Sequence, residues 1–190
     1  MCTLSWLYHG NNHYEVYFNR DEQRSRLPAL EPQSVVIDGV HCLMPIDPVG
    51  GGSWISTNEH GVTVCLLNYY QGTTPKGELS SRGNIVKRLA SSCSSSTVDS
   101  RLLGMDLSAF APFTVVSFDT RRTSNETVMW TWDGQQLHRS HAFAPIVSSV
   151  IVSCSKQEMH YQSIDNHRNV DFRTSLSCMA NDVAEQGVFK

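Results

Sequence analysis

The chain has 190 residues, of which 40% are hydrophobic and 17% charged, and its formal net charge at pH 7 is -3. A chain of this length and composition can bury one sizeable core, so we expect a single domain over residues 1–190. The charges form no basic run, which argues against nucleic-acid binding, and the apolar runs are far shorter than the roughly 20 residues of a membrane-spanning helix.

Cysteine usage and the N-terminal residues favour a cytoplasmic location. Six widely spaced cysteines include no C-x-x-C pair, which argues against a zinc ribbon and against a dense disulfide framework. The N-terminus has neither the cationic nor the apolar region of a secretory signal. We expect no metal site, because His138 and His141 are three apart in a predicted strand and point to opposite faces.

The first 20 residues predict a β-hairpin. Residues 2–8 and 14–19 alternate in polarity, and Gly10-Asn11-Asn12 between them are turn residues. A turn centred near residue 11 places Cys2 opposite Asn19 or Arg20. The hairpin therefore brings the N-terminus to residues 20–26, where five of seven residues are charged.

A second hairpin follows a proline-rich stretch. Residues 27–49 contain four prolines and predict loop and edge structure. Residues 53–57 and 62–69 then flank a turn at 58–61, which sets Asn68 opposite about Gly51. The run Gly50-Gly51-Gly52 leaves open space beside Asn68, as a ligand or a close backbone approach would require, although a flexible strand lead-in explains it equally well.

In the rest of the chain two helices are followed by more strands and then by helix, an order that predicts an α+β domain in which helices cover antiparallel sheet. The apolar period changes to that of a helix after Ser81, and a capping box at residues 155–158 precedes a final amphipathic helix. The elements are a helix face at Ile85, Val86 and Leu89, a short helix near 98–103, strands at 113–118, 127–132, 135–140 and 146–153, and a helical stripe at Phe172, Leu176, Met179 and Val183.

Cys2 is the first candidate for chemistry. Removal of Met1 would leave a thiol and a free α-amine on one residue, with reference pKa values of about 8.5 and about 7.7 to 8.0, so that the amine can serve as a base for the thiol. Arg20 beside it would favour the thiolate. The alternative is an ordinary cysteine of a first strand.

Two further residues complete a candidate catalytic set. Asp21 can accept a hydrogen bond from the α-ammonium group, and Asn68 can donate its side-chain amide to a developing oxyanion. The alternative is that Asp21, Asn68 and the neighbouring charges serve local turns and a solvated loop.

Four motifs stand out: the opening MCTLSW, the tetrad Asn19-Arg20-Asp21-Glu22, the segment Gly51-Gly52-Ser53-Trp54-Ile55-Ser56, and Asn68-Tyr69. Together they resemble the NRDE family, also called the transport and Golgi organisation protein 2 family. The resemblance implies a single family domain, and it makes Asn19, Glu22, Gly51, Gly52 and Trp54 candidates for substrate binding.

That family is similar in turn to N-terminal-nucleophile (Ntn) hydrolases of the bile-salt hydrolase and penicillin V acylase type. This similarity implies a four-layer αββα sandwich of mostly antiparallel sheets, with Cys2, Arg20, Asp21 and Asn68 as catalytic residues. One departure is visible: those hydrolases separate the arginine and the aspartate by two residues, whereas Arg20 and Asp21 are adjacent and would point oppositely on a strand.

Two functions from different classes follow. The first is hydrolysis of a small amide substrate by the Cys2 thiolate, without a cofactor. The second is a non-catalytic protein that binds or transfers haem or lipid, since members of the resembled family are linked to intracellular haem and lipid handling. A third alternative is a structural domain whose charged tetrad only fixes the end of a strand.

Overall fold

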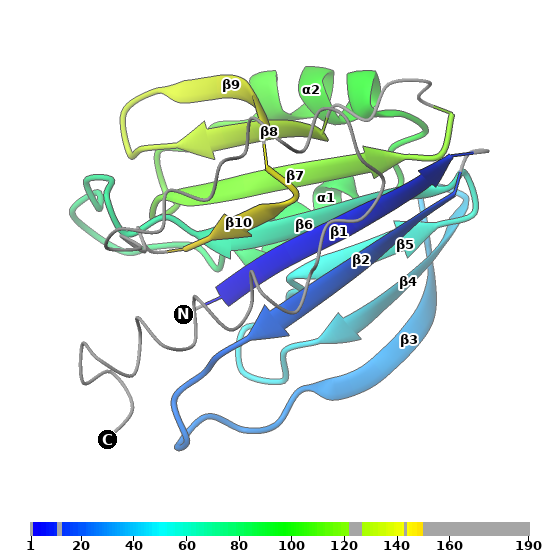
Figure 1. Ribbon diagram of the computed structural model, residues 1–190. Coiled ribbons are helices and arrows are strands. Elements are labelled where there is room, and N and C mark those ends of the chain that lie inside the picture. The colour runs from blue at the N-terminus through cyan, green and yellow to red at the C-terminus, as the bar shows by residue number, and fades with distance from the viewer. Residues whose placement is uncertain (1, 11–12, 122–126, 143, 150–190) are drawn as a thin grey trace, which may run out of the picture. The chain divides into compact units, whose positions relative to one another are not determined.

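The computed structural model describes residues 2–10, 13–121, 127–142 and 144–149. They belong to the first of two compact units of the chain, Met1–Val150 (Figure 1). The predicted C-terminal helix at 155–183, and the part of the predicted last strand beyond Ser149, lie outside the described residues. The same holds for the helices that would form the fourth layer of the predicted sandwich.

Two antiparallel sheets form most of this unit. The larger has seven strands in the order β3-β4-β5-β6-β7-β8-β9, and the smaller has three in the order β10-β1-β2. The strands are β1 Cys2–Gly10, β2 His13–Arg20, β3 Leu30–Ile37, β4 Val40–Ile46, β5 Ile55–Asn58, β6 Val62–Asn68, β7 Phe113–Asp119, β8 Thr127–Trp132, β9 Leu137–Ala142 and β10 Ile146–Ser148.

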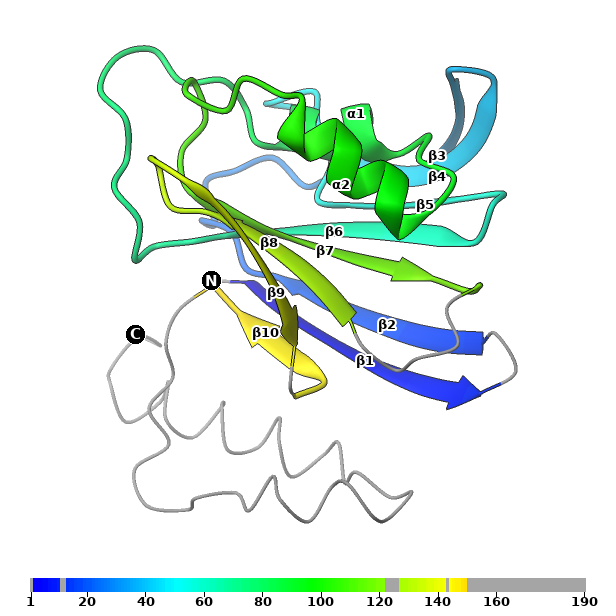
Figure 2. The ribbon, with the colours of Figure 1, turned by 90° about the horizontal axis from the view of Figure 1, so that it is seen from above.

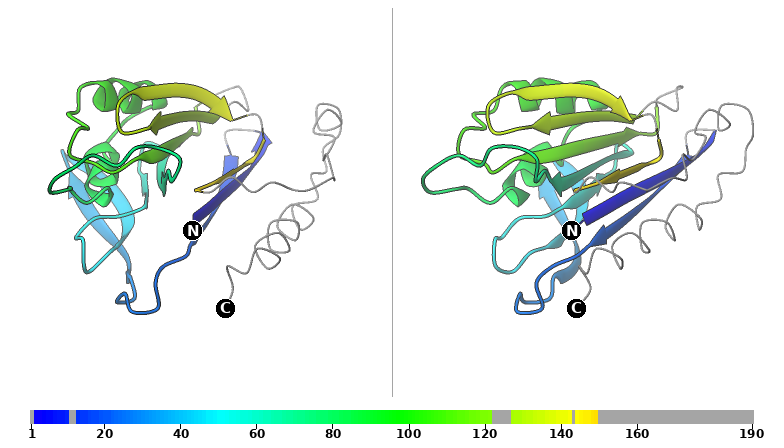
Figure 3. Two further views of the ribbon diagram at one scale, coloured as in Figure 1. Left: turned by 90° about the vertical axis from the view of Figure 1, so that its left-hand side faces the viewer. Right: turned by 60° about the vertical axis from the view of Figure 1, so that its left-hand side comes forward.

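Two helices cover the face of the large sheet that the small sheet leaves open. They are α1 Gly83–Leu89 and α2 Ser95–Leu103, and the Ser94 hydroxyl caps α2 by accepting from the Thr97 amide at 3.1 Å. Figure 2 shows the helices on one side of the large sheet and β1, β2 and β10 on the other. Seen from the side in Figure 3, the two sheets are separate layers. The predicted α+β class with mostly antiparallel sheets is confirmed.

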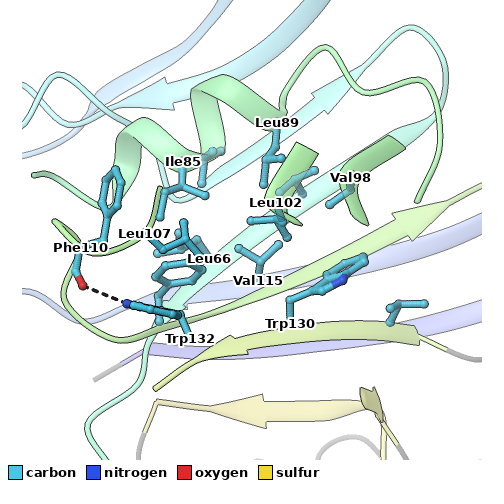
Figure 4. Close-up of a cluster of buried hydrophobic side chains, with 14 of the residues drawn as sticks. Leu66, Ile85, Leu89, Val98, Leu102, Leu107, Phe110, Val115, Trp130 and Trp132 are labelled. Carbon is cyan, nitrogen blue, oxygen red and sulfur yellow. Dashed lines mark hydrogen bonds between the residues drawn. The ribbon is translucent and has the colours of Figure 1, made fainter. Parts of the chain in front are cut away.

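The central strands are buried on both faces, because each face packs on a different layer. On β6, Val64 and Leu66 face the helices, and Cys65 and Leu67 face the small sheet. Figure 4 shows the helix-side cluster, in which Trp132 donates its indole N–H to the Phe110 carbonyl at 3.1 Å. A strand with this environment has a continuous apolar run in its sequence, as residues 64–67 do.

The first predicted hairpin register is confirmed, since Cys2 pairs with Arg20. The second differs by one residue: Ile55 pairs with Cys65, so the same register extended would set Asn68 opposite Gly52 rather than Gly51. The proline-rich stretch holds a full hairpin, β3–β4, with β3 at the sheet edge. Its turn is Asp38-Gly39, and both residues have positive φ, at 50° and 79°. That backbone conformation matches the twist of a two-residue hairpin.

Candidate functional site

Three of the four predicted catalytic residues meet where the two sheets end together. Cys2 begins β1, Arg20 ends β2 and Asn68 ends β6, and all three line one cavity of about 310 Å³. The remaining lining comes from the 22–26 and 47–54 loops, from β6, from the start of α1 and from residues that precede α1 and β7. It comprises Glu22, Arg26, Asp47, Gly52, Ser53, Trp54, Leu66, Leu79, Ser80, Ser81, Arg82, Gly83 and Ala111.

Cys2 is buried, with 7% of its surface exposed, and its backbone is fixed by Ser149. The Cys2 N–H donates to the Ser149 hydroxyl at 2.8 Å, and the Ser149 N–H donates to the Cys2 carbonyl at 3.0 Å. Burial raises the pKa of the Cys2 thiol, against the positive N-terminus and a backbone hydrogen bond from Asp21, which both lower it. The resting thiol is therefore protonated at neutral pH.

Arg20 lies on the same side of the small sheet as Cys2, because directly paired residues of antiparallel strands share a face. Its guanidinium carbon stacks 4.2 Å from the centre of the Trp54 ring. It also pairs with Glu22 at 2.9 Å and Asp47 at 3.8 Å, and its side chain is 15% exposed. Trp54 thus holds Arg20 in place instead of offering that ring face to a ligand.

Asp47 joins two arginines to the loop that closes the cavity. It pairs with both Arg20 and Arg26, and its other oxygen accepts from the Val49 amide at 3.1 Å. Burial alone would raise the pKa of Asp47, but the Arg26 hydrogen bond, the Val49 amide and the two guanidinium charges hold it below its ordinary value. Asp47 is therefore a charged anchor of the site.

Asp21 and Asn19 do not line the cavity. Both side chains are exposed, and the Asn19 amide donates to the Asp21 carboxylate at 3.1 Å. The alternation of the strand, which sets Arg20 toward the cavity, accounts for the opposite direction of its neighbours. Asp21 acts on Cys2 through its backbone hydrogen bond and, more weakly, through its charge.

Asn68 lines the cavity with a hydrogen-bonding group to spare. Its side-chain nitrogen donates to the Tyr70 hydroxyl at 2.8 Å. A carboxamide nitrogen carries two N–H donors, so one remains for a ligand in the cavity. The oxyanion role of Asn68 stays a prediction, for which this second N–H is the available donor.

The glycine run serves a turn and a close backbone contact. Gly51 has φ of +65° and is exposed outside the cavity lining. Gly52 lies against Gly83, where an added Cβ would come within 2.5 Å of the Gly83 carbonyl carbon. The Ser53 amide donates to the Gly83 carbonyl at 3.2 Å, so this contact joins the loop to the start of α1.

The lining or supporting residues that were missed from the sequence include Arg26, Asp47, Arg82 and Ser149. Arg26 belongs to the charged stretch and Arg82 to the Ser81-Arg82-Gly83 segment, so charge density and local motif could have indicated both. Asp47 and Ser149 carry no local signal, because each acts through a partner brought near by the tertiary fold.

In the part of the chain that the structure describes, no group of three or more His, Cys, Asp or Glu residues is arranged to hold a metal ion. His138 and His141 both lie on β9, and His138 pairs with Asp133 at 2.9 Å. Nor does any helix within the described ranges have the length and apolar character needed to cross a membrane.

A comparison with models of known protein families shows the family to which this chain belongs. The model of the family described as "Transport and Golgi organisation 2" matches residues 1–182. The chain belongs to the Transport and Golgi organisation 2 family. The resemblance read from the N-terminal motifs is thereby confirmed, and it extends over most of the chain. The comparison with curated proteins gives no match.

Two solved hydrolase structures are similar to this family member in fold. A mutant of the conjugated bile acid hydrolase from Clostridium perfringens matches with a TM-score of 0.56 and 12% identity, over 87% of this chain and 57% of that one. Penicillin V acylase from Agrobacterium tumefaciens matches with a TM-score of 0.52 and 12% identity, over 87% of this chain and 58% of that one. At such identity the likeness shows the fold alone. The chain spans under two thirds of the length of these enzymes.

Proposed function

We propose that this Transport and Golgi organisation 2 family member is an N-terminal-cysteine amidohydrolase that acts on a small amide. The observation that carries the proposal is the arrangement around Cys2. Its thiol lines a cavity shared with Asn68, and its backbone nitrogen is held at 2.8 Å by the Ser149 hydroxyl. Once Met1 is removed, that nitrogen is an α-amine already positioned beside the thiol that it must deprotonate.

The proposed reaction balances with the groups at hand. The α-amine takes the thiol proton, Cys2 Sγ bonds to the substrate carbonyl carbon, and the free N–H of Asn68 donates to the oxyanion. The resulting α-ammonium then protonates the leaving amine as the C–N bond breaks, which leaves a thioester on Cys2. Water, deprotonated by the same amine, attacks the thioester and releases the acid.

Within this reaction Ser149 is a positioning residue. Its hydroxyl holds the Cys2 nitrogen from a fully buried position and does not need to touch the substrate. We expect Ser149→Ala to lower kcat more than it raises KM, because the amine loses its hydrogen-bond partner. The limb of the pH profile on which activity rises with pH should also shift, since this limb reports the pKa of the general base. Ser149→Thr, which keeps the hydroxyl, should retain more activity.

The test of the proposal combines mass and turnover. Intact mass should show loss of Met1, and amine release from a panel of small amides should require Cys2. Cys2→Ser should be strongly impaired, whereas Cys93→Ser, which changes an exposed cysteine outside the cavity, should be unaffected. An uncleavable extension before Cys2 turns the amine into an amide, which should cost about 10² to 10⁴ in rate. Full activity in protein that retains Met1 would exclude the mechanism.

A second candidate function rests on a different cavity. A mostly apolar groove of about 460 Å³ runs between β2 and β3–β5, and His13 stands on its wall. Its apolar lining includes Val16, Leu43, Met44 and Ile55. An apolar groove with one imidazole suits haem, which takes a histidine as an axial ligand, or an acyl chain that needs no ligand.

Haemin titration tests this second candidate. A saturable Soret shift should depend on His13, so that His13→Ala abolishes it and His138→Ala, an exposed histidine on β9, leaves it unchanged. A shift that survives both replacements, or no shift, would count against haem binding in this groove.

A further inference from the structure

The charges that line the Cys2 cavity are unevenly paired. Three arginines and two carboxylates line it. Arg20 pairs with Glu22 and Asp47, and Arg26 pairs with the same two carboxylates. Two guanidinium groups and two carboxylates therefore neutralise one another. The third arginine, Arg82, adds one uncompensated positive charge.

Arg82 has one hydrogen bond and no ion pair among the described residues. Its Nη1 donates to the Pro112 carbonyl at 3.0 Å. A guanidinium group offers five N–H donors in one plane, so most of its donors are left for a ligand or for water. Ser80 and Ser81, which precede it, line the same wall and add two hydroxyl groups.

The half-buried position of Arg82 makes this excess charge costly unless something compensates it. Burial lowers the pKa of the Arg82 guanidinium, while Tyr70, Cys2 and Glu22 act in the opposite direction. A guanidinium group nevertheless stays charged in proteins, so the cavity retains a desolvated cation with a planar set of donors. A carboxylate fits such a group with two parallel hydrogen bonds.

We propose that Arg82 makes the Cys2 cavity selective for substrates that carry a carboxylate near the amide bond. This proposal rests on the proposed amide hydrolysis at Cys2, and it specifies the class of substrate that the site would hydrolyse. Cys2 and Arg82 line the same 310 Å³ cavity, so a compact substrate can present its carbonyl to one and its anion to the other. N-acyl amino acids have this arrangement.

The experiment uses substrate pairs that differ only in charge. N-acetyl, N-butyryl, N-octanoyl and N-phenylacetyl glycine are each compared with the matching glycinamide in the full chain after removal of Met1. We expect kcat/KM for release of the acyl acid to be about 10- to 100-fold higher for the carboxylates, as charged hydrogen bonds allow. Arg82→Gln, which keeps a donor for the Pro112 carbonyl, should abolish this preference and leave the glycinamides within about threefold.

Two further variants separate charge from structure. Arg82→Lys keeps the charge but not the planar fork, so it should retain part of the preference. Arg88→Gln removes one positive charge from the exposed side of α1, outside the cavity, and should change nothing. Equal losses on carboxylates and glycinamides in Arg82→Gln would show that Arg82 only supports the fold and would overturn the inference.

A binding measurement tests the carboxylate selectivity independently of the proposed hydrolysis. Calorimetry with Cys2→Ser protein measures affinity for the same pairs without turnover. Tighter binding of the carboxylates that Arg82→Gln removes supports the inference even if no amide is hydrolysed. Hydrolysis without any charge preference leaves the proposed function in place and overturns the inference. If no pair shows a carboxylate preference in either binding or turnover, the inference is likewise overturned.

Discussion

Cys2 and Cys93 place two thiols in opposite environments. Cys2 is buried at the cavity, where burial raises its pKa, whereas Cys93 is exposed and contacts the Thr97 hydroxyl at 3.2 Å, an interaction that lowers its pKa. Because the thiolate is the reactive form, the two should differ in alkylation. The proposed nucleophile is thus protected at rest and depends on its base for activation.

We expect iodoacetamide at pH 7 to modify Cys93 at least about tenfold faster than Cys2 in protein that retains Met1, because both thiolate fraction and access favour Cys93. Peptide-level mass spectrometry over a time course measures both rates in one sample. Cys65, which is fully buried, should be modified only on unfolding. Faster modification of Cys2 would contradict burial as the dominant influence on this thiol.

Asp47 is the residue on which the paired charges of the cavity depend. Asp47→Asn would leave Arg20 and Arg26 with Glu22 alone. The Asp47 side chain is 11% exposed, but that of Arg26 is 34% exposed, so solvent screens part of the loss. We expect a decrease of about 1 to 3 kcal/mol in the free energy of unfolding at pH 7, measured with urea. Glu78→Gln, an exposed carboxylate outside the cavity, is the control and should change little.

The loss of unfolding free energy in Asp47→Asn should depend on pH in a defined direction. The folded-state pKa of Asp47 lies below its ordinary value of 3.8, so the folded state binds a proton less readily than the unfolded state does. The stabilisation is therefore complete above about pH 4 to 5 and is lost as pH falls through the folded-state pKa. The difference in unfolding free energy between the unchanged protein and Asp47→Asn should therefore become smaller in acid. A difference that grows in acid would contradict the role of Asp47 as a charged partner of the two arginines.

At the scale of elements, the site depends on the contact between the 47–54 loop and α1. Gly52→Ala would place a methyl group 2.5 Å from the Gly83 carbonyl carbon, and backbone on both sides must then move. We expect a loss of about 1 to 3 kcal/mol in stability, as for other overpacked contacts, together with weaker ligand binding in the cavity.

Gly104→Ala provides the matched control for that change. Gly104 follows α2 with φ of -86°, and an added Cβ would be 3.5 Å from the Ser100 carbonyl oxygen, an ordinary contact. Its thermal unfolding midpoint should stay close to that of the unchanged protein, whereas that of Gly52→Ala should fall. Equal midpoints for the two variants would show that the loop absorbs the methyl group without cost.

At the scale of the whole molecule, the large sheet separates two apolar cores. Leu102 packs on the helix side, and Leu67 packs on the side of the small sheet, in the cluster that contains Cys2. Both leucines are almost fully buried, with 0% and 1% of their surface exposed. Replacing either by alanine removes the same atoms from a different layer, which makes them a matched pair.

We expect Leu67→Ala and Leu102→Ala each to cost about 2 to 5 kcal/mol in stability. Only Leu67→Ala should change the alkylation rate of Cys2, because the void left by the missing Leu67 side chain lies in the same apolar cluster as the Cys2 thiol. The rate is measured well below the unfolding midpoint of each variant. Equal effects of both variants on Cys2 would show that the two cores are not independent.

The sequence by itself determined most of the elements and part of their local pairing, but not the β3–β4 hairpin of the proline-rich stretch. The Cys2–Arg20 register follows from residues 2–20, because alternation and turn residues act within one hairpin. The helix face at Ile85, Val86 and Leu89 follows from the helical period in the same way, whereas the second helix, predicted near 98–103, begins at Ser95. The one-residue difference at Asn68 shows the limit of this reasoning, since counting from a four-residue turn does not fix which residues pair.

Only the tertiary structure decided which side chains meet at the cavity. Ser149 reaches the Cys2 nitrogen across 147 residues, and Asp47 joins arginines from a different loop. The physical reason is that strand and helix periods are set by bonds within a few residues, whereas a buried charge or hydroxyl takes its partner from whichever layer the whole core packs against it.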